Sequence, residues 1–183
     1  MGEPIVSVNE LEAEYRVPND GQYKLIKITD GYASKHIRGL LEAVEPNGQV
    51  SLSSALTLKF HNDPDVLYAF RQVVDKGVTI RLLLDYNVDW AEKKEAVEWV
   101  KYFYASPRAG NLVVKQSKEK LTHWLIVDQK HIRLEEPHPP DPQVTSNAIM
   151  YHVDKSTEEP VKLLVLAILQ TFEQRWLHSS VIK

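Results

Sequence analysis

Cysteine is absent from the 183-residue chain, which excludes disulfide bonds, thiolate metal sites and a cysteine nucleophile. Long apolar runs are missing as well. The longest, residues 163–169, is seven residues, whereas a membrane span needs about 20, so we expect a core helix that is apolar on nearly every side. The amino terminus has no basic segment followed by an apolar one, which excludes a secretory signal. These absences favour a cytoplasmic protein.

Strong charge of either sign is also missing. The 22 Lys and Arg residues against 25 Asp and Glu residues give a net charge of −3, which does not indicate a nucleic-acid partner. The Walker A, Gly-x-Gly-x-x-Gly and Gly-x-Ser-x-Gly motifs do not occur, and we expect no cofactor. The hydrophobic fraction of 43% is typical of a globular domain, and the length fits a single one.

Strand-like and helix-like segments alternate from residue 22 onward. A helical face at Ile37, Leu40, Leu41 and Val44, and the caps Asp63 and Asp89, predict three of the helices. The expected strands are 23–29, 50–53, 78–84, 112–115, 121–127, 131–134 and 148–153, and a long helix is expected over 158–177. We expect residues 1–21 to form a helical leader. Residues 22–183 form one α/β domain with a mixed, mostly parallel sheet flanked by helices and an antiparallel hairpin at 121–135.

The hairpin and the loop after it hold the densest group of ionisable side chains in the sequence. Two interpretations stay open: the side chains alternate outward into solvent, or they line a ligand pocket at the end of the hairpin. The candidate ligand-binding residues are His123, His131, Arg133, Glu135, Glu136, His138 and Asn147. Zinc ligation by these histidines and glutamates lacks a His-Glu-x-x-His helix, and we assign no metal.

Four segments of the sequence resemble one half of the phospholipase D-like superfamily. They are the strand Gly77-Val-Thr-Ile-Arg-Leu-Leu-Leu-Asp85, residues 111–115, the hairpin 121–133 and the closing helix around Phe172-Glu-Gln-Arg-Trp176. The resemblance covers about residues 23–178 and lies more in the order of elements than in identities. It implies the α/β fold of that superfamily.

Active members of the superfamily carry a His-x-Lys-x4-Asp motif on this hairpin, with the His as nucleophile. Placing the motif's Asp on Asp128 puts its His at Leu121 and its Lys at His123, and the family's small residue and Asn fall at Glu136 and His138. Leucine cannot attack phosphorus, and two neighbouring carboxylates repel a phosphate. The resemblance therefore implies a pseudoenzyme that has lost phosphodiesterase chemistry.

Three functional hypotheses follow. The first is an inactive phospholipase D-like domain that senses a small ligand or binds a protein, as a homodimer because the family's halves pair face to face across the hairpin region. The second is a divergent hydrolase that uses His123 or His138 with Glu136. The third is a regulatory or assembly subunit without a small ligand.

Overall fold

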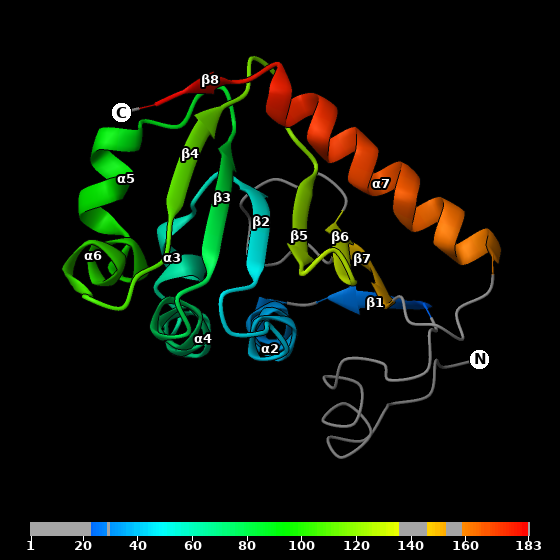
Figure 1. Ribbon diagram of the computed structural model, residues 1–183, viewed down its shortest axis with the longest axis horizontal. Coiled ribbons are helices and arrows are strands. Elements are labelled where there is room, and N and C mark those ends of the chain that lie inside the picture. Colours follow the sequence, from blue (N-terminus) through cyan, green and yellow to red (C-terminus); the bar gives the residue numbers. More distant parts are fainter. Residues whose placement is uncertain (1–22, 29, 136–145, 153–158, 183) are drawn as a thin grey trace.

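A computed structural model describes residues 23–28, 30–135, 146–152 and 159–182, which form an α/β domain around one sheet of eight strands (Figure 1). The expected leader over residues 1–21 lies outside the described residues. The elements run in the order β1 (Tyr23–Ile28), α2 (Asp30–Glu42), β2 (Gln49–Ser54), α3 (Leu58–His61), α4 (Pro64–Asp75), β3 (Thr79–Leu84), α5 (Trp90–Ala96), α6 (Glu98–Ala105), β4 (Leu112–Gln116), β5 (His123–Val127), β6 (His131–Glu135), β7 (Ser146–His152), α7 (Glu159–Leu177) and β8 (Ser180–Val181).

The sheet is mixed, as the sequence predicts, and its strand order is β1-β7-β6-β5-β2-β3-β4-β8. β2 and β4 run parallel to β3, whereas every other neighbouring pair is antiparallel. Antiparallel pairs therefore outnumber parallel ones, against the expectation of a mostly parallel sheet. The reason is that, of the successive strands joined through helices, only β2 with β3 and β3 with β4 lie side by side in the sheet. A parallel pair requires such a crossover, whereas an antiparallel hairpin does not.

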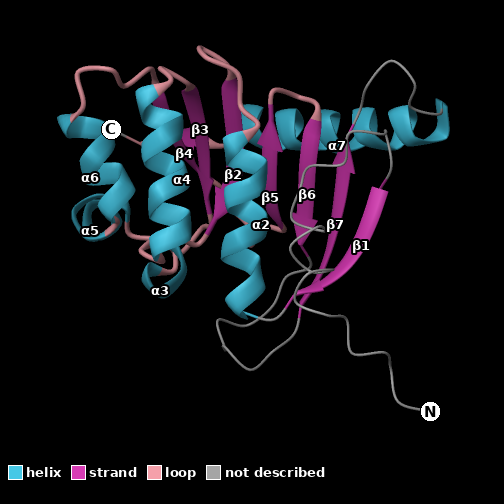
Figure 2. Ribbon diagram, turned by 90° about the horizontal axis from the view of Figure 1, so that it is seen from below, coloured by secondary structure: helices cyan, strands magenta, loops and turns pink. Residues whose placement is uncertain are grey.

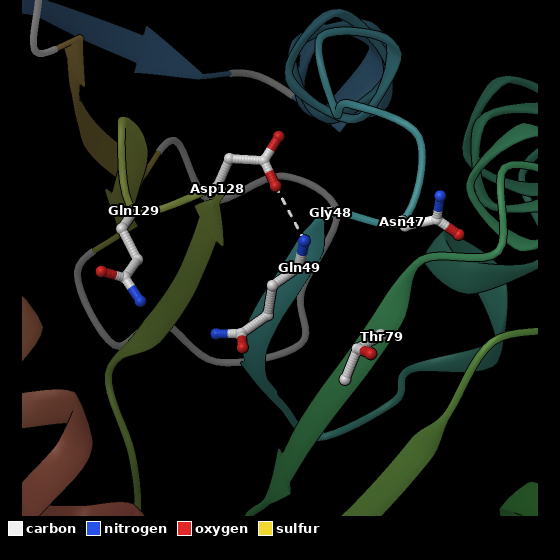
Figure 3. A pocket seen from close by; sticks show the side chains of 6 residues that line it. All are labelled: Asn47, Gly48, Gln49, Thr79, Asp128 and Gln129. Carbon is white, nitrogen blue, oxygen red and sulfur yellow. Dashed lines mark hydrogen bonds between the residues drawn. The ribbon is translucent and has the colours of Figure 1, made fainter.

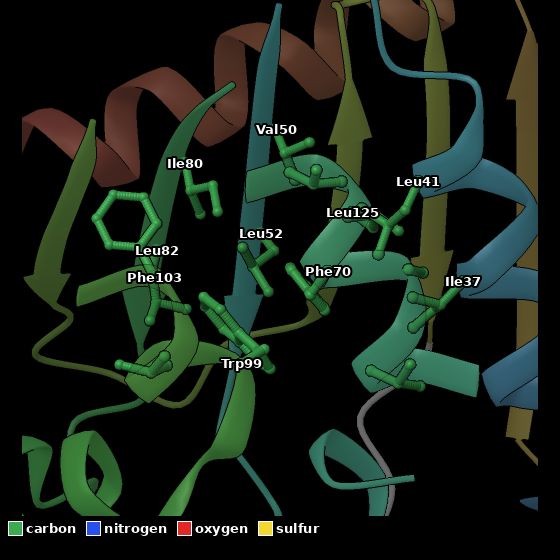
Figure 4. Close-up of a cluster of buried hydrophobic side chains, with 14 of the residues drawn as sticks. Ile37, Leu41, Val50, Leu52, Phe70, Ile80, Leu82, Trp99, Phe103 and Leu125 are labelled. Atoms are coloured by element: carbon green, nitrogen blue, oxygen red, sulfur yellow. The ribbon is translucent and has the colours of Figure 1, made fainter. Parts of the chain in front are cut away.

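Helices α2, α4 and α6 cover one face of the sheet (Figure 2). The Asp63 side chain caps α4 by accepting a hydrogen bond from the amide of Asp65 at 2.9 Å, and Pro64 fills the first helical position, as predicted. In the centre of this core the rings of Phe70 and Trp99 stack with their centroids 4.3 Å apart (Figure 4). Around them pack the apolar residues Ile37, Leu41, Val50, Leu52, Ile80, Leu82, Phe103 and Leu125.

The single helix expected after Asp89 is two helices, α5 and α6, which meet at Val97 in extended conformation (φ −88°, ψ 112°). Asn62 explains the break, since its side chain donates to the carbonyl of Ala96 and accepts from the amide of Glu98, both at 3.0 Å. One amide side chain therefore satisfies the end of one helix and the start of the next. Tyr104 of α6 is 54% exposed.

Helix α7 lies across the opposite face of the sheet (Figure 2). Its buried residues Val165, Phe172 and Trp176 pack on a second apolar cluster formed by Leu83, Leu121, Trp124, Ile126 and Ile132. The composition of the helix predicted burial on nearly every side, and this prediction is wrong: Leu163, Leu164 and Leu166 are exposed. One helix on an open sheet face can bury only one of its sides. Within the described residues, no helix is long and apolar enough to cross a membrane.

Arg81 of β3 fastens the carboxyl-terminal half of α7 to the sheet. Its guanidinium donates from both terminal nitrogens to the carboxylate of Glu173, with Nη2 2.8 Å from Oε2, and lies 4.4 Å from the ring centroid of Trp176. These hydrogen bonds lower the pKa of Glu173. Lys115 adds a hydrogen bond of 2.8 Å from Nζ to the carbonyl of Trp176.

The Phe172→Ala substitution tests the contribution of this second core. We expect it to lower the free energy of unfolding in urea by about 3–5 kcal/mol, because Phe172 is 1% exposed and its removal leaves a cavity beneath α7. Leu177→Ala, at a 73% exposed position of the same helix, is the control and should cost no more than about 0.5 kcal/mol. Equal effects of the two substitutions would contradict the docking of α7 described above.

Candidate functional site

The β5–β6 hairpin brings together four of the residues singled out in the sequence. His123 lies opposite Glu135, Arg133 lies opposite Leu125, and His131 begins β6 opposite Val127. Residues that face one another across an antiparallel pair project to the same side of the sheet. Because Leu125 and Val127 belong to the core under α2 and α4, the polar row of β6 projects toward those helices.

The polar row of β6 consists of His131, Arg133 and Glu135, and the burial of these residues tests whether they point to solvent. His131, Arg133 and Glu135 are 9%, 2% and 7% exposed, so the interpretation in which they point to solvent is wrong. His123 is half-buried. The sequence suggested solvation because charged residues alternate with apolar ones, a pattern typical of strands with one wet face. Here both faces of the sheet carry helices.

Arg133 and Glu135 form an ion pair inside the domain, with Nη1 of Arg133 2.7 Å from Oε2 of Glu135. The side chains are only 3% and 10% exposed. Removing two charges from water carries a large desolvation cost, which the pair offsets only when the remaining donors and acceptors are also satisfied. Among the described residues, Nε and Nη2 of Arg133 have no hydrogen-bond partner.

Two candidate residues from the sequence, Glu136 and His138, lie outside the described residues. Asn147 lies in β7, next to the residue that pairs with Glu135 of β6. The described part of the chain contains no group of three His, Asp or Glu residues arranged to hold a metal ion. Zinc ligation through His138 or Glu136 therefore stays untested.

Sequence reasoning missed His61, which ends the short helix α3 and is 4% exposed. Its Nδ1 accepts a 3.3 Å hydrogen bond from the indole N–H of Trp99, and its Nε2 lies 2.9 Å from Oγ of Ser54. Because the indole can only donate, Nδ1 is the unprotonated nitrogen and Nε2–H donates to Ser54. A lone histidine in the segment Leu58-Lys-Phe-His61 gives no sequence signal for this arrangement.

Burial, together with the smaller influence of the nearby His123, lowers the pKa of His61 to about 3. His61 is therefore neutral at physiological pH, which fits a ring that accepts from Trp99 and donates to Ser54. The influence of His123 on His61 also shows that the two imidazoles lie near one another. Ser54 of β2, His61 of α3 and Trp99 of α6 therefore form a second cluster of polar side chains, which lies beside the polar row of β6.

The polar row of β6 and this second cluster lie side by side at the strand β2, which pairs with a parallel strand on one side and an antiparallel strand on the other. The antiparallel register of β2 with β5 ends at Ser53 and Trp124, and the next residues, Ser54 and His123, both belong to this polar region. From the carboxyl end of β2 the chain turns to β3 on one side, while β5 lies on the other side. In α/β sheets such a switch point, outside the carboxyl ends of the strands, is the usual place for a ligand.

Asp128 lies at the opposite end of β5 and has a structural role. Its two carboxylate oxygens accept from the amides of Glu45 at 2.8 Å and Gln49 at 2.7 Å, which ties the β5–β6 turn to the start of β2 (Figure 3). An open pocket of about 310 Å³ surrounds this contact, lined by Asn47, Gly48, Gln49, Thr79, Asp128 and Gln129. Both carboxylate oxygens of Asp128 already accept hydrogen bonds from backbone amides, so this carboxylate has little capacity left to bind a ligand or take part in catalysis.

The depressed pKa of His61 predicts a pH dependence of stability. Unfolded histidine takes up a proton near pH 6.5, whereas native His61 does so only near pH 3, so the unfolded state binds more protons between these values. The stability that neutral His61 contributes is complete above about pH 6.5 and is lost as the pH falls toward 3, by as much as about 1.4 kcal/mol per pH unit.

Urea unfolding of the wild type and the His61→Gln variant, between about pH 7 and pH 4, measures this contribution. We expect the variant to be less stable at neutral pH and to lose less stability on acidification. His178→Gln, at an exposed histidine just beyond α7, should keep the wild-type slope. An unchanged slope in His61→Gln would show that His61 is not buried in its neutral form.

No protein-family model and no curated protein matches this sequence. The solved structures with a similar fold include the two that follow. TrmBL2, an archaeal chromatin protein whose structure shows a novel mode of DNA binding, matches with a TM-score of 0.62 at 14% identity, over 92% of this chain and 55% of its own. The present chain therefore spans about half the length of TrmBL2.

The second structure is Nuc from Salmonella typhimurium, a phospholipase D family member. It matches with a TM-score of 0.60 at 11% identity, over 88% of this chain and 98% of its own. At these identities the likeness extends to the fold and not to the activity. The resemblance found in the sequence is thus confirmed at the level of architecture: the chain has an α/β fold similar to that of a phospholipase D family member.

Proposed function

We propose that this domain is a phospholipase D-like fold without phosphodiesterase activity, which binds a small ligand and works as a homodimer. The observation that carries the proposal is the place of Leu121, where alignment of the family motif on Asp128 puts the nucleophile. Leu121 is 2% exposed and packs with Trp124 and Phe172 in the core beneath α7. Its amide donates to Asp85 at 2.9 Å, which holds this position in place.

The residue at the position of the motif's lysine supports the same proposal. His123 is half-buried and lies opposite Glu135, which itself pairs with Arg133. A phosphate at this place would meet the carboxylate of Glu135 instead of an ammonium group. The region is polar and largely enclosed, and it lacks the lysine that the family motif places there. Binding of DNA is not part of the proposal, because the net charge of the chain is −3.

An assay with bis(p-nitrophenyl) phosphate tests the loss of catalysis. We expect no release of nitrophenol above buffer from the wild type or from His123→Ala, with an active phosphodiesterase assayed in parallel to show that the conditions permit turnover. The divergent-hydrolase hypothesis requires the opposite result. Turnover by the wild type that His123→Ala abolishes would therefore overturn the proposal.

Self-association has a separate test. The amino-terminal half of α7 exposes Leu163, Leu164 and Leu166, at 63%, 45% and 48%, and a row of exposed leucines is typical of a contact surface. We expect sedimentation velocity to give a dimer at tens of micromolar, and the Leu163→Glu/Leu166→Glu double variant to shift the species toward monomer. The Tyr86→Glu variant, at an exposed aromatic residue outside α7, should remain dimeric. A strictly monomeric wild type would contradict this part of the proposal.

A further inference from the structure

We infer that Arg133 is the anchor for the carboxylate group of a small organic ligand, held on the buried side of the β5–β6 hairpin. The inference rests on the proposed function, in which the domain binds a ligand, and it names the chemistry of that ligand. The starting observation is that two buried nitrogens of Arg133, Nε and Nη2, have no hydrogen-bond partner among the described residues.

The guanidinium of Arg133 uses only part of its hydrogen-bonding capacity. Nη1 donates to Glu135 at 2.7 Å, while Nε and Nη2 are buried and have no partner among the described residues. These two nitrogens lie on the same edge of the guanidinium plane. Together they present two parallel N–H groups, the arrangement that binds both oxygens of one carboxylate.

Leaving this edge empty is costly. A buried donor without an acceptor destabilises a protein because it has given up its hydrogen bonds to water, and a charged donor costs more than a neutral one. More than about 90% of buried polar groups in native proteins are paired for this reason. An arginine that is 2% exposed and half-satisfied is therefore an exception that needs a physical explanation, and a bound oxyanion provides one.

Arg81 in the same sheet provides a direct comparison. Its side chain projects to the opposite face, and two of its nitrogens donate to the two carboxylate oxygens of Glu173. An arginine whose role is to attach α7 is thus matched by a carboxylate of the chain itself. Glu135 is bound differently, because it meets Arg133 through one guanidinium nitrogen and leaves the side-on edge free.

The surroundings of Arg133 favour a carboxylate over a phosphate. Glu135 already compensates the positive charge of Arg133, so a ligand adds negative charge to a buried site. A monoanion costs less than a dianion in a medium of low polarity. His131 lies on the same strand face and His123 lies opposite Glu135, so the surroundings of Arg133 are polar.

Thermal unfolding of the full chain with added acetate, pyruvate, phosphate or chloride, at equal ionic strength, tests the inference. We expect at least one carboxylate to raise Tm by about 3–5 °C at about ten times its Kd, and phosphate and chloride to raise it less. Two-dimensional NMR should show the Arg133 Nε–H resonance moving with the same saturation curve.

Variants separate an Arg133 site from general salt effects. Arg133→Lys keeps the charge but lacks the paired N–H groups, so the affinity for the carboxylate should fall at least about tenfold. Arg81→Lys, the matched control on the other face, should keep the wild-type affinity. If Arg133→Lys does not fold, the Arg133→Met/Glu135→Met double variant replaces the whole buried pair with apolar side chains, and such replacements are often tolerated. It should fold and show no carboxylate response.

Three results would overturn the inference: no carboxylate response in the wild type, a response that survives the loss of Arg133, or a response to phosphate alone. Each is distinct from the failure of the proposed function, which would be revealed by phosphodiester turnover. A protein that neither hydrolyses a phosphodiester nor binds a carboxylate would refute only the present inference.

Discussion

The organisation of this domain depends on the way β2 is paired. β2 hydrogen-bonds to a parallel strand on one side and to an antiparallel strand on the other. Its carboxyl end therefore lies beside the start of β5 and the end of β6, which brings His123 and Glu135 near Ser54 and His61. A sheet with only parallel strands would place the hairpin elsewhere, and these polar groups would not meet.

Two layers of helices then determine which polar residues are buried. β6 belongs to a sheet with helices on both faces, so its residues are enclosed whether they point toward α2 or toward α7. On the α7 face this suits Ile132, which is apolar. On the other face it encloses Arg133 and Glu135, which must satisfy each other's charge. The polar row is therefore a constraint on the fold as well as a candidate site.

Much of the architecture could be predicted from the sequence because it depends on local signals. The cap at Asp63, the positive φ of 69° at Gly77 and the alternation of apolar segments all act within a few residues. The break at Val97 could not be predicted, since it depends on Asn62, 35 residues earlier. His61 was missed for the same reason: Trp99 and Ser54, which hold its ring, come from other elements.

The candidate site was predicted in part. The sequence identified the hairpin and the residues His123, His131, Arg133 and Glu135, because ionisable side chains are concentrated there. It could not show that these residues are buried, since alternation of charged and apolar residues is typical of a strand with one face in solvent, and strands covered on both faces are usually apolar throughout. Nor could the sequence show that Arg81 donates to a carboxylate from two guanidinium nitrogens and Arg133 from only one, because this difference arises from tertiary contacts.

The central claim is that the inner face of the β5–β6 hairpin is a buried binding site and not a catalytic or solvated one. A crystal structure of the domain grown in acetate tests it most directly. The account predicts a carboxylate with its two oxygens on Nε and Nη2 of Arg133 while Leu121 stays in the core beneath α7. An Arg133 side chain that faces bulk solvent, or whose free edge is filled by another group of the chain, would contradict the account.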